Sequence, residues 1–293
     1  MSTSAFPLIV LAALGLGVGV AARPAKSARE ARMLDGPATT VGNGTARLFV
    51  ERGPDRKPSA IGIALTRGAL TGLSTHMNST SRCFDKSGDG TLAHGECLGD
   101  DQVNLALPTG AEKLGLPFRW AMVNWNPEGH MHPAPPVWGA AHFDFHFYIA
   151  TRATVDAIRP GPCAEIIDCE DFKRASIPLP VDQAPEGHID VGAAVAAMGN
   201  HLVDSKDPEL ADPSLGFSST FIYGTYDGRM IFLEPMVSHA FLASKPDRCT
   251  PVRGAKAVGE TGYYPTRYCV RYDLTAKEYR VSLEGLTYRI AVN

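Results

Sequence analysis

The sequence predicts a mainly β protein, an α+β chain built as a jelly-roll-like sandwich or barrel with a few short helices. Short stretches of alternating apolar and polar residues recur along most of the chain, as expected for strands with one buried face. Glycine and proline are frequent, with 29 and 22 residues, which suits many turns between short strands. Helical patterns are few and short, so helices are expected only as additions to the sheets.

The chain begins with an apolar stretch that is typical of an export signal. Residues 6–22 are almost entirely apolar and precede small residues and arginines, so we expect residues 1–22 to be a signal peptide. A retained membrane anchor is the alternative, because the stretch approaches the length of a membrane span. Residues 23–44 lack periodicity and are expected to form a flexible tether to a single mainly β domain at 45–293. Export places that domain in the periplasm or outside the cell, with no membrane contact after cleavage.

Alternation predicts strands throughout this domain. The expected strands cover residues 45–51, 60–66, 118–125, 142–150, 218–226, 229–237, 267–274 and 278–292. Asp227-Gly228 favours a two-residue hairpin turn, because both residues tolerate positive φ angles. Two helices are expected, one over 151–159 with Thr151 as its cap and one over 190–202, where alanines favour helix and two glycines oppose it.

Charge and cysteine content narrow the class of protein. A net charge of −3 without a basic stripe argues against nucleic acid as a partner. An even number of cysteines suits disulfides in an exported protein. The six are Cys83, Cys97, Cys163, Cys169, Cys249 and Cys269. Their spacing favours pairing between neighbours, although six cysteines allow many connectivities and the sequence does not choose among them.

The stretch GAAHFDFHFYIA at 139–150 carries a concentrated set of possible metal ligands. Alternate side chains of a strand share a face, so His142, Asp144 and His146 are expected to project together, with three phenylalanines on the opposite face. The alternative is an ordinary half-exposed strand. Solvent-facing strand positions carry Thr, Lys or Glu more often than a His-x-Asp-x-His pattern, so we favour a metal site.

Other segments offer ligands for the same cation. The loop NWNPEGHMHP supplies His130 and His132, and MGNHLVD supplies His201. IFLEPM places Glu234 between apolar neighbours, where a carboxylate is costly unless it is paired or binds a cation. The preferred ligands are His142, His146 and His201, with His130 or Glu234 as the fourth. Asp144 is expected to orient a ligand ring.

This set of ligands predicts a bound divalent transition metal, with zinc, iron and manganese all compatible. An open coordination position would acidify bound water and permit hydrolase or lyase chemistry on a small molecule. Glu234, Glu128 or Asp144 is then the expected base. A closed shell would only store the metal or stabilise the fold. The sequence does not decide whether the protein is an enzyme.

The stretch DKSGDGTLAHGE at 85–96 follows the pattern of a calcium-binding loop. Oxygen-bearing residues fall at its ligand positions, namely Asp85, Ser87, Asp89, Thr91 and Glu96. The flanks lack the helical period that normally accompanies such a loop, but Cys83 and Cys97 could close it by a disulfide. A polar surface loop is the alternative. The second functional hypothesis is therefore a non-catalytic extracellular or envelope binding protein with a calcium-stabilised loop.

Four strings resemble, in order, a largely bacterial family catalogued as a domain of unknown function and typified by a sigma-E-regulated protein of Thermus. They are GH at 129–130, HFDFHFYIA at 142–150, MGNH at 198–201 and FIYGTYDGRMIFLEPM at 221–236. The resemblance covers roughly residues 45–245 and implies a mainly β fold, homo-oligomers and no settled activity. GHMHP at 129–133 is also similar to the metal-binding loop of cupins, which implies a cupin-like shape.

Overall fold

The computed structural model describes residues 1–2, 32–76, 83–93, 96–97, 102–130, 137–164 and 166–292, and the structural statements below concern these residues. Apart from residues 1–2, the predicted signal peptide lies outside them, as does His132. In the described part of the chain, no helix combines the length and apolar character needed to cross a membrane.

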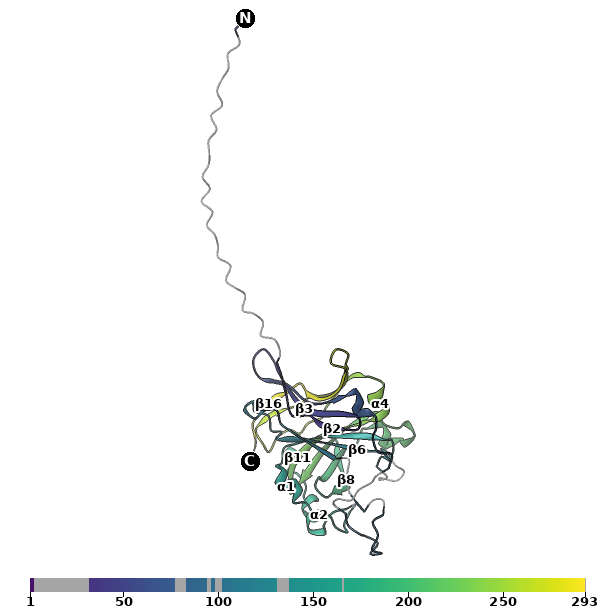
Figure 1. The fold of residues 1–293 in the computed structure, drawn as a ribbon. Helices are drawn as coiled ribbons and strands as arrows, with labels where there is room; N and C mark the ends of the chain where they lie inside the picture. Colours follow the sequence, from purple (N-terminus) through teal and green to yellow (C-terminus); the bar gives the residue numbers. More distant parts are fainter. Residues whose placement is uncertain are drawn as a thin grey trace.

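Two open, antiparallel sheets form a β-sandwich (Figure 1). The first, here called the terminal sheet, has the order β1 (Arg32–Asp35), β3 (Gly44–Arg52), β4 (Pro58–Thr66), β15 (Glu278–Glu284), β14 (Arg267–Asp273) and β12 (Asp247–Pro251), with β2 (Thr39–Val41) paired to β3. The second, here called the histidine sheet, has the order β5 (Gln102–Ala106), β6 (Trp120–Asn126), β7 (His142–Tyr148), β11 (Arg229–Ser238), β10 (Ser219–Tyr226), β9 (Gly199–Asp204) and β8 (His188–Val195). Both sheets end in edge strands, so a mainly β sandwich is confirmed and the described strands close no barrel.

Smaller elements complete the described fold. A two-stranded sheet pairs β13 (Gly262–Tyr264) with β16 (Thr287–Arg289). The α-helices are α1 (Arg152–Asp156), α2 (Cys169–Ala175), α3 (Pro208–Ala211) and α4 (His239–Ala243). Single 3₁₀ turns lie at Arg67–Leu70, Ala111–Lys113, Val181–Gln183 and Pro213–Leu215.

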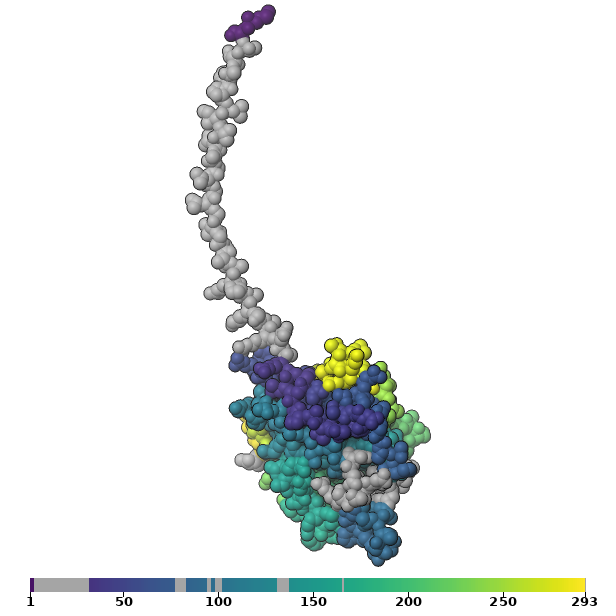
Figure 2. Space-filling model, in the orientation of Figure 1, coloured from purple at the N-terminus to yellow at the C-terminus, as the bar shows by residue number. Residues whose placement is uncertain are grey.

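The terminal sheet joins the two ends of the described domain. β4 pairs with β15 in antiparallel register, with Ile63 opposite Val281. On the molecular surface, segments from the start and the end of this domain accordingly lie side by side (Figure 2). This pairing joins the first strands of the domain to its last strands within one sheet.

The core between the two sheets is built from the strand faces that the alternation predicts to be apolar. Phe143, Phe145 and Phe147 are fully buried there, on the side of β7 opposite the histidines. Leu48 and Ile63 of the terminal sheet belong to the same cluster and are also fully buried. Burial of side chains of this size contributes about 1.5–3 kcal/mol each relative to exposure.

The histidine face of β7 is also buried, under a second apolar layer. Trp138, Ile158 and Ile167 come from connecting segments and pack against Tyr148 and Phe232 of the histidine sheet. Helices α1 and α2 lie on this side of the sheet, away from β3 (Figure 1). The histidine sheet is therefore covered on both faces, and polar groups on the histidine face have left bulk water.

The strand and turn predictions agree with the structure in most places. β3, β4, β6, β7, β10, β11, β14 and β15 fall within two residues of their expected starts. Asp227 and Gly228 have φ angles of 55° and 69°, which confirms the hairpin turn. α1 confirms the first helix, because the Thr151 side chain accepts a hydrogen bond from the backbone N–H of Thr154.

Two expectations are wrong. The helix predicted over 190–202 forms β8 and β9 instead, because β10 satisfies the backbone of β9 and Gly199, with a φ of 99°, cannot continue a helix. Residues 32–44, predicted to belong to the flexible tether, contain β1 and β2 instead, and the rest of the predicted tether, residues 23–31, lies outside the described residues. β1 pairs with β3, with Leu34 opposite Val50. A strand of four residues is too short to show a clear alternation in the sequence, and its pairing with β3 determines its structure.

Candidate metal centre

The candidate site is built on the histidine face of β7 and on its two neighbouring strands. In the register between β6 and β7, Asn126 lies opposite His142 and Asn124 lies opposite Asp144. On the other side, Leu233 pairs with Phe147 and Met236 with Asp144, a register that places Glu234 opposite His146. Polar side chains thus meet on one buried sheet face, where each needs a partner.

His130, His142 and Asp144 form the first group, here called the open cluster. One ligand atom from each residue lies within 4.8 Å of the others. Nε2 of His142 is 3.3 Å from Oδ1 of Asp144, and Nε2 of His130 is 3.7 Å from Oδ2. The His130 side chain is 36% exposed whereas the other two are buried, so this cluster faces solvent on the His130 side.

Hydrogen bonds around the open cluster fix the orientation of its side chains. Nδ1 of His142 is 2.7 Å from the carbonyl oxygen of Ala140, to which it donates, so Nε2 carries the lone pair of the neutral ring. The Asn126 amide donates to Oδ2 of Asp144 at 2.7 Å. Ligating histidines and carboxylates are commonly oriented by outer hydrogen bonds of this kind.

A tight loop brings His130 to the strand. The N–H of His130 donates to the carbonyl oxygen of Trp138 at 2.9 Å. Gly129 precedes it with a φ of 67°, and a Cβ at this position would overlap the backbone of Trp138 and Gly139. Glycine is therefore required here both for the backbone conformation and for the close approach.

His146, His201 and Glu234 form the second group, here called the closed cluster. Their ligand atoms also lie within 4.8 Å of one another. Oε2 of Glu234 is 3.5 Å from Nε2 of His146 and 3.9 Å from Nε2 of His201. The three side chains are 0%, 12% and 2% exposed in the order His146, His201, Glu234, and they come from three different strands.

The spacing of these atoms is wider than hydrogen bonding and suits a shared cation. Two ligand atoms on a tetrahedral zinc ion, each about 2.1 Å from the metal, stand ~3.4 Å apart. The distances of 3.3–3.9 Å between imidazole and carboxylate atoms bracket that value. Among the described residues, no hydrogen bond reaches Nε2 of His142, Oδ1 of Asp144, either ring nitrogen of His146, or Oε2 of Glu234.

The carboxyl groups of the two clusters have pKa values that are shifted in opposite directions. Burial raises the pKa of Asp144, but the facing rings of His142 and His130 outweigh it and hold that pKa well below its usual range. Burial lowers the pKa of His146 to about 3. Burial, together with the charge of Asp144, raises the pKa of Glu234 well above its usual range. Among the described residues, neither carboxylate has a Lys or Arg as an ion-pair partner.

The predicted ligands all lie on this face, but in two groups rather than one. His142, His146 and His201 were expected around a single cation, whereas His142 groups with His130 and the other two with Glu234. Asp144, expected to orient a ring, itself lies among the ligand atoms. Glu128, an expected base, is 3.3 Å from Nδ1 of His76.

Sequence reasoning missed the contribution of Asn126. Asn124 and Asn126 alternate at the end of the predicted strand, so their position on one face could have indicated a polar neighbour for His142 and Asp144. The alternation of residue types does not indicate the contribution of Ala140 and Ala193. Their backbone carbonyl oxygens accept hydrogen bonds from the rings of His142 and His201.

The acidic loop between Cys83 and Cys97 is closed by its own hydrogen bonds. Asp85 accepts from the N–H groups of Gly88 and Gly90, and Glu96 accepts from those of Lys86, Ser87 and Ala93. Asp89 accepts from Thr91. Among the described residues, the groups that could hold a metal include no residue of this loop.

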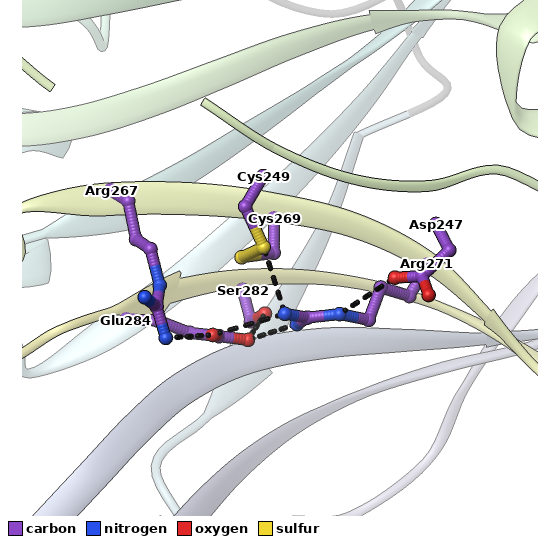
Figure 3. The surroundings of a disulfide bond; sticks show 7 residues. All are labelled: Asp247, Cys249, Arg267, Cys269, Arg271, Ser282 and Glu284. Atoms are coloured by element: carbon purple, nitrogen blue, oxygen red, sulfur yellow. Dashed lines mark hydrogen bonds and ion pairs between the residues drawn. A yellow bond between two sulfur atoms is a disulfide. The ribbon is translucent and has the colours of Figure 1, made fainter. Parts of the chain in front are cut away.

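The three disulfides join Cys83 to Cys97, Cys163 to Cys169, and Cys249 to Cys269, so pairing between neighbours is confirmed. Around the last bridge, Arg271 contacts Cys249, Asp247 and Glu284 (Figure 3). Cys249, Cys269 and Glu284 lie close enough to hold a metal, but both sulfur atoms are committed to the disulfide. Three disulfides indicate an oxidising compartment such as the cell exterior.

Comparison with known proteins gave no family model, no curated protein and no solved structure that matches this chain. The resemblance described above therefore depends only on the sequence strings that carry it.

Proposed function

We propose that this is an exported metalloprotein whose working centre is a divalent transition metal held by His130, His142 and Asp144. One observation carries the proposal: Nε2 of His142 and Oδ1 of Asp144 face each other at 3.3 Å, buried, without a hydrogen-bond partner among the described residues. Because Nδ1 of His142 donates to Ala140, Nε2 is the ring nitrogen that is left to bind a cation beside the carboxylate oxygen. A cation between the two atoms would bond to both.

The competing explanation is a simple ion pair between a protonated His142 and Asp144. Charge-assisted N–H···O hydrogen bonds are shorter, about 2.7–2.9 Å. The third member of the group, His130, also directs Nε2 toward the same carboxylate. Two imidazoles and one carboxylate are a common ligand set for zinc, iron and manganese, whereas an ion pair needs only one imidazole.

The solvent side of the open cluster supports a catalytic role over simple storage. Three protein ligands leave a coordination position, and His130, the exposed member, marks the side from which a small molecule can approach. A metal in such a site supplies an acidified water for hydrolysis or elimination. Asn126 keeps the Asp144 carboxylate oriented by its hydrogen bond. The substrate class is therefore a small molecule with a polar group that can reach the cluster from the His130 side.

Metal content tests the proposal. The purified full chain is dialysed, loaded with zinc, and its bound zinc measured by elemental analysis. We expect His142→Ala to bind one equivalent of zinc less than wild type. His130→Ala, which changes a loop residue outside the sheet, is expected to weaken zinc binding at the same site. His76→Ala is the matched control, because His76 is 74% exposed and belongs to neither cluster. Unchanged zinc content in folded His142→Ala would contradict the proposal.

Catalysis is tested separately with p-nitrophenyl acetate as a general ester probe. We expect zinc-loaded protein to hydrolyse it faster than the metal-free form, with the difference lost in His130→Ala. Equal rates in the loaded and metal-free forms would favour the second candidate, a non-catalytic extracellular binding protein. That candidate is supported by the disulfide that closes the acidic loop.

Membership of the Thermus-type family of unknown function and assembly into homo-oligomers belong to this proposal. They are supported by the strings HFDFHFYIA and FIYGTYDGRMIFLEPM. Sedimentation of the mature chain, cleaved after residue 22, tests the oligomeric state. A purely monomeric protein at micromolar concentration would count against this part.

A further inference from the structure

We propose that His146, His201 and Glu234 form a second, separate cation site, so that the chain binds two divalent transition metals on one face of the histidine sheet. The proposal does not depend on the working centre assigned above, because the two clusters share no ligand. It gives the closed cluster a structural role, in contrast to the solvent-facing open cluster.

The ligand atoms of the closed cluster converge on a common centre. Oε2 of Glu234 lies between the two rings, 3.5 Å from Nε2 of His146 and 3.9 Å from Nε2 of His201. Nδ1 of His201 is 2.7 Å from the carbonyl oxygen of Ala193 and donates to it, which leaves Nε2 as the acceptor of the neutral ring. The arrangement repeats the ring–carbonyl hydrogen bond seen at His142 in the open cluster.

Unpartnered buried atoms supply the independent observation. Among the described residues, both ring nitrogens of the fully buried His146 and Oε2 of the 2% exposed Glu234 lack a hydrogen-bond partner. Leaving such buried groups unsatisfied destabilises the folded state. A cation bound by Nε2 of His146 and by Glu234 would remove most of this cost without moving the backbone.

Aromatic side chains surround the closed cluster, and its burial predicts slow metal exchange. Phe232 packs edge-on against both rings, with centroid distances of 4.8 Å to His146 and 5.2 Å to His201. Tyr148 stacks on His146 at 5.7 Å. Gly224 lies opposite Phe232, and its missing side chain provides the space for the Phe232 ring. His201, with a side chain that is 12% exposed, is the least buried of the three ligands.

The two clusters draw on different positions of β7. His142 and Asp144 belong to the open cluster and His146 to the closed cluster, and the clusters share no ligand. Residues four apart in a strand have Cα atoms roughly 13 Å apart, and this separates His142 from His146. Each cluster has three ligand atoms within 4.8 Å of one another, which suits one cation in each.

The experiment counts zinc in the full chain after removal of metal with a chelator and refilling with zinc alone. We expect two equivalents in wild type, one in His142→Ala, one in His201→Ala and none in the double variant. Zinc remaining in His142→Ala is expected to leave for a competing chelator at least tenfold more slowly than zinc remaining in His201→Ala. His188→Gln is the matched control, because His188 lies on neighbouring β8 but in neither cluster.

Folding is checked by circular dichroism, and a second variant keeps the test decisive if His201→Ala fails to fold. Glu234→Gln preserves the shape of the side chain and removes the ligand charge, so it is expected to lose one equivalent. Cobalt refilling supplies a spectroscopic readout, with two additive sets of visible bands in wild type and one in Glu234→Gln. Wild type with one equivalent that disappears in His142→Ala and persists in Glu234→Gln would overturn the second site while leaving the first intact.

Discussion

The amide of Asn126 donates a hydrogen bond of 2.7 Å to Oδ2 of Asp144 inside the buried face of the histidine sheet. The bond turns Oδ1, the other carboxylate oxygen, toward Nε2 of His142. Asn126 is not itself within a candidate ligand group, and its role is to position one. This arrangement couples the end of β6 to the candidate metal ligands of β7.

Asn126→Ala is expected to weaken zinc binding at the open cluster by about 10–100-fold, the usual cost of losing an outer hydrogen bond to a ligand. The measurement is a competition titration with a chromophoric zinc chelator. Asn104→Ala on the edge strand β5 serves as the control, because Asn104 is exposed and β6 separates its strand from β7. Equal affinities in wild type and folded Asn126→Ala would show that Asp144 needs no such support.

Gly224→Ala is expected to destabilise the protein by about 1–3 kcal/mol, the typical cost of overpacking. A Cβ at residue 224 would overlap the ring of Phe232, which packs against His146 and His201. Urea unfolding measures the loss.

The matched test for Gly224 is a double-mutant cycle with Phe232→Leu. The smaller, flexible side chain should accommodate the new methyl group, so Gly224→Ala should cost less in the Phe232→Leu background than in wild type. An equal cost in both backgrounds would place the strain in the backbone rather than in the contact with Phe232.

The face of β7 that carries the histidines could be predicted from the sequence, but its burial could not. Alternation in HFDFHFY separates His142 and His146 from the phenylalanines, and the structure keeps that separation. The layer that covers the histidines comes from connecting segments, including Trp138 and Ile167. Such segments have no period of their own, so the sequence gives no sign of which sheet face they cover.

The division into two clusters follows from strand order, which local patterns do not determine. Glu234 reaches His146 because β11 pairs directly with β7, and His201 arrives from β9 across β10. Residue types alone indicated the pool of candidate ligands. Their grouping required the order and register of β7, β9, β10 and β11.

Asp207 predicts a dependence of stability on pH. Burial raises the pKa of Asp207 to about 6, with a smaller contribution from the charge of Glu209, against a hydrogen bond from Thr220. The unfolded chain loses this proton near pH 3.9, so between pH 4 and 6 the folded state binds more protons than the unfolded state. Stability from this group is therefore complete below about pH 4 and is lost as the pH rises through 6.

Asp207→Asn should remove that loss. The variant is expected to match wild type at pH 4 and to exceed its stability at pH 7 by about 1 kcal/mol, after allowance for solvent screening of the ionised group. Such a difference corresponds to a melting temperature higher by about 2–4 °C. Thermal unfolding at both pH values provides the comparison. An identical difference at pH 4 and pH 7 would assign the effect to packing rather than to ionisation.

The acidic loop permits a decisive test of the calcium hypothesis through Glu96. Both carboxylate oxygens of Glu96 accept backbone N–H groups, from Lys86, Ser87 and Ala93, at 2.8–2.9 Å. Glu96→Gln replaces one acceptor with a donor, so at least one of these N–H groups loses its partner. We expect faster amide exchange in the loop and a local destabilisation of about 1–3 kcal/mol, with or without calcium.

Calcium adds a second, separable effect if the loop binds it. A site with a dissociation constant near 10⁻³ M stabilises the folded protein by about 1.4 kcal/mol at ten times that calcium concentration. The melting temperature of wild type should then rise with calcium while that of Glu96→Gln should not, because the variant lacks the bidentate carboxylate. Ser59→Ala in the terminal sheet is the control, since its hydroxyl donates a hydrogen bond to the backbone carbonyl of Glu51, which lies outside the acidic loop. An equal rise in wild type and Glu96→Gln would place any bound calcium elsewhere, and no rise in wild type would leave the loop with a purely structural function.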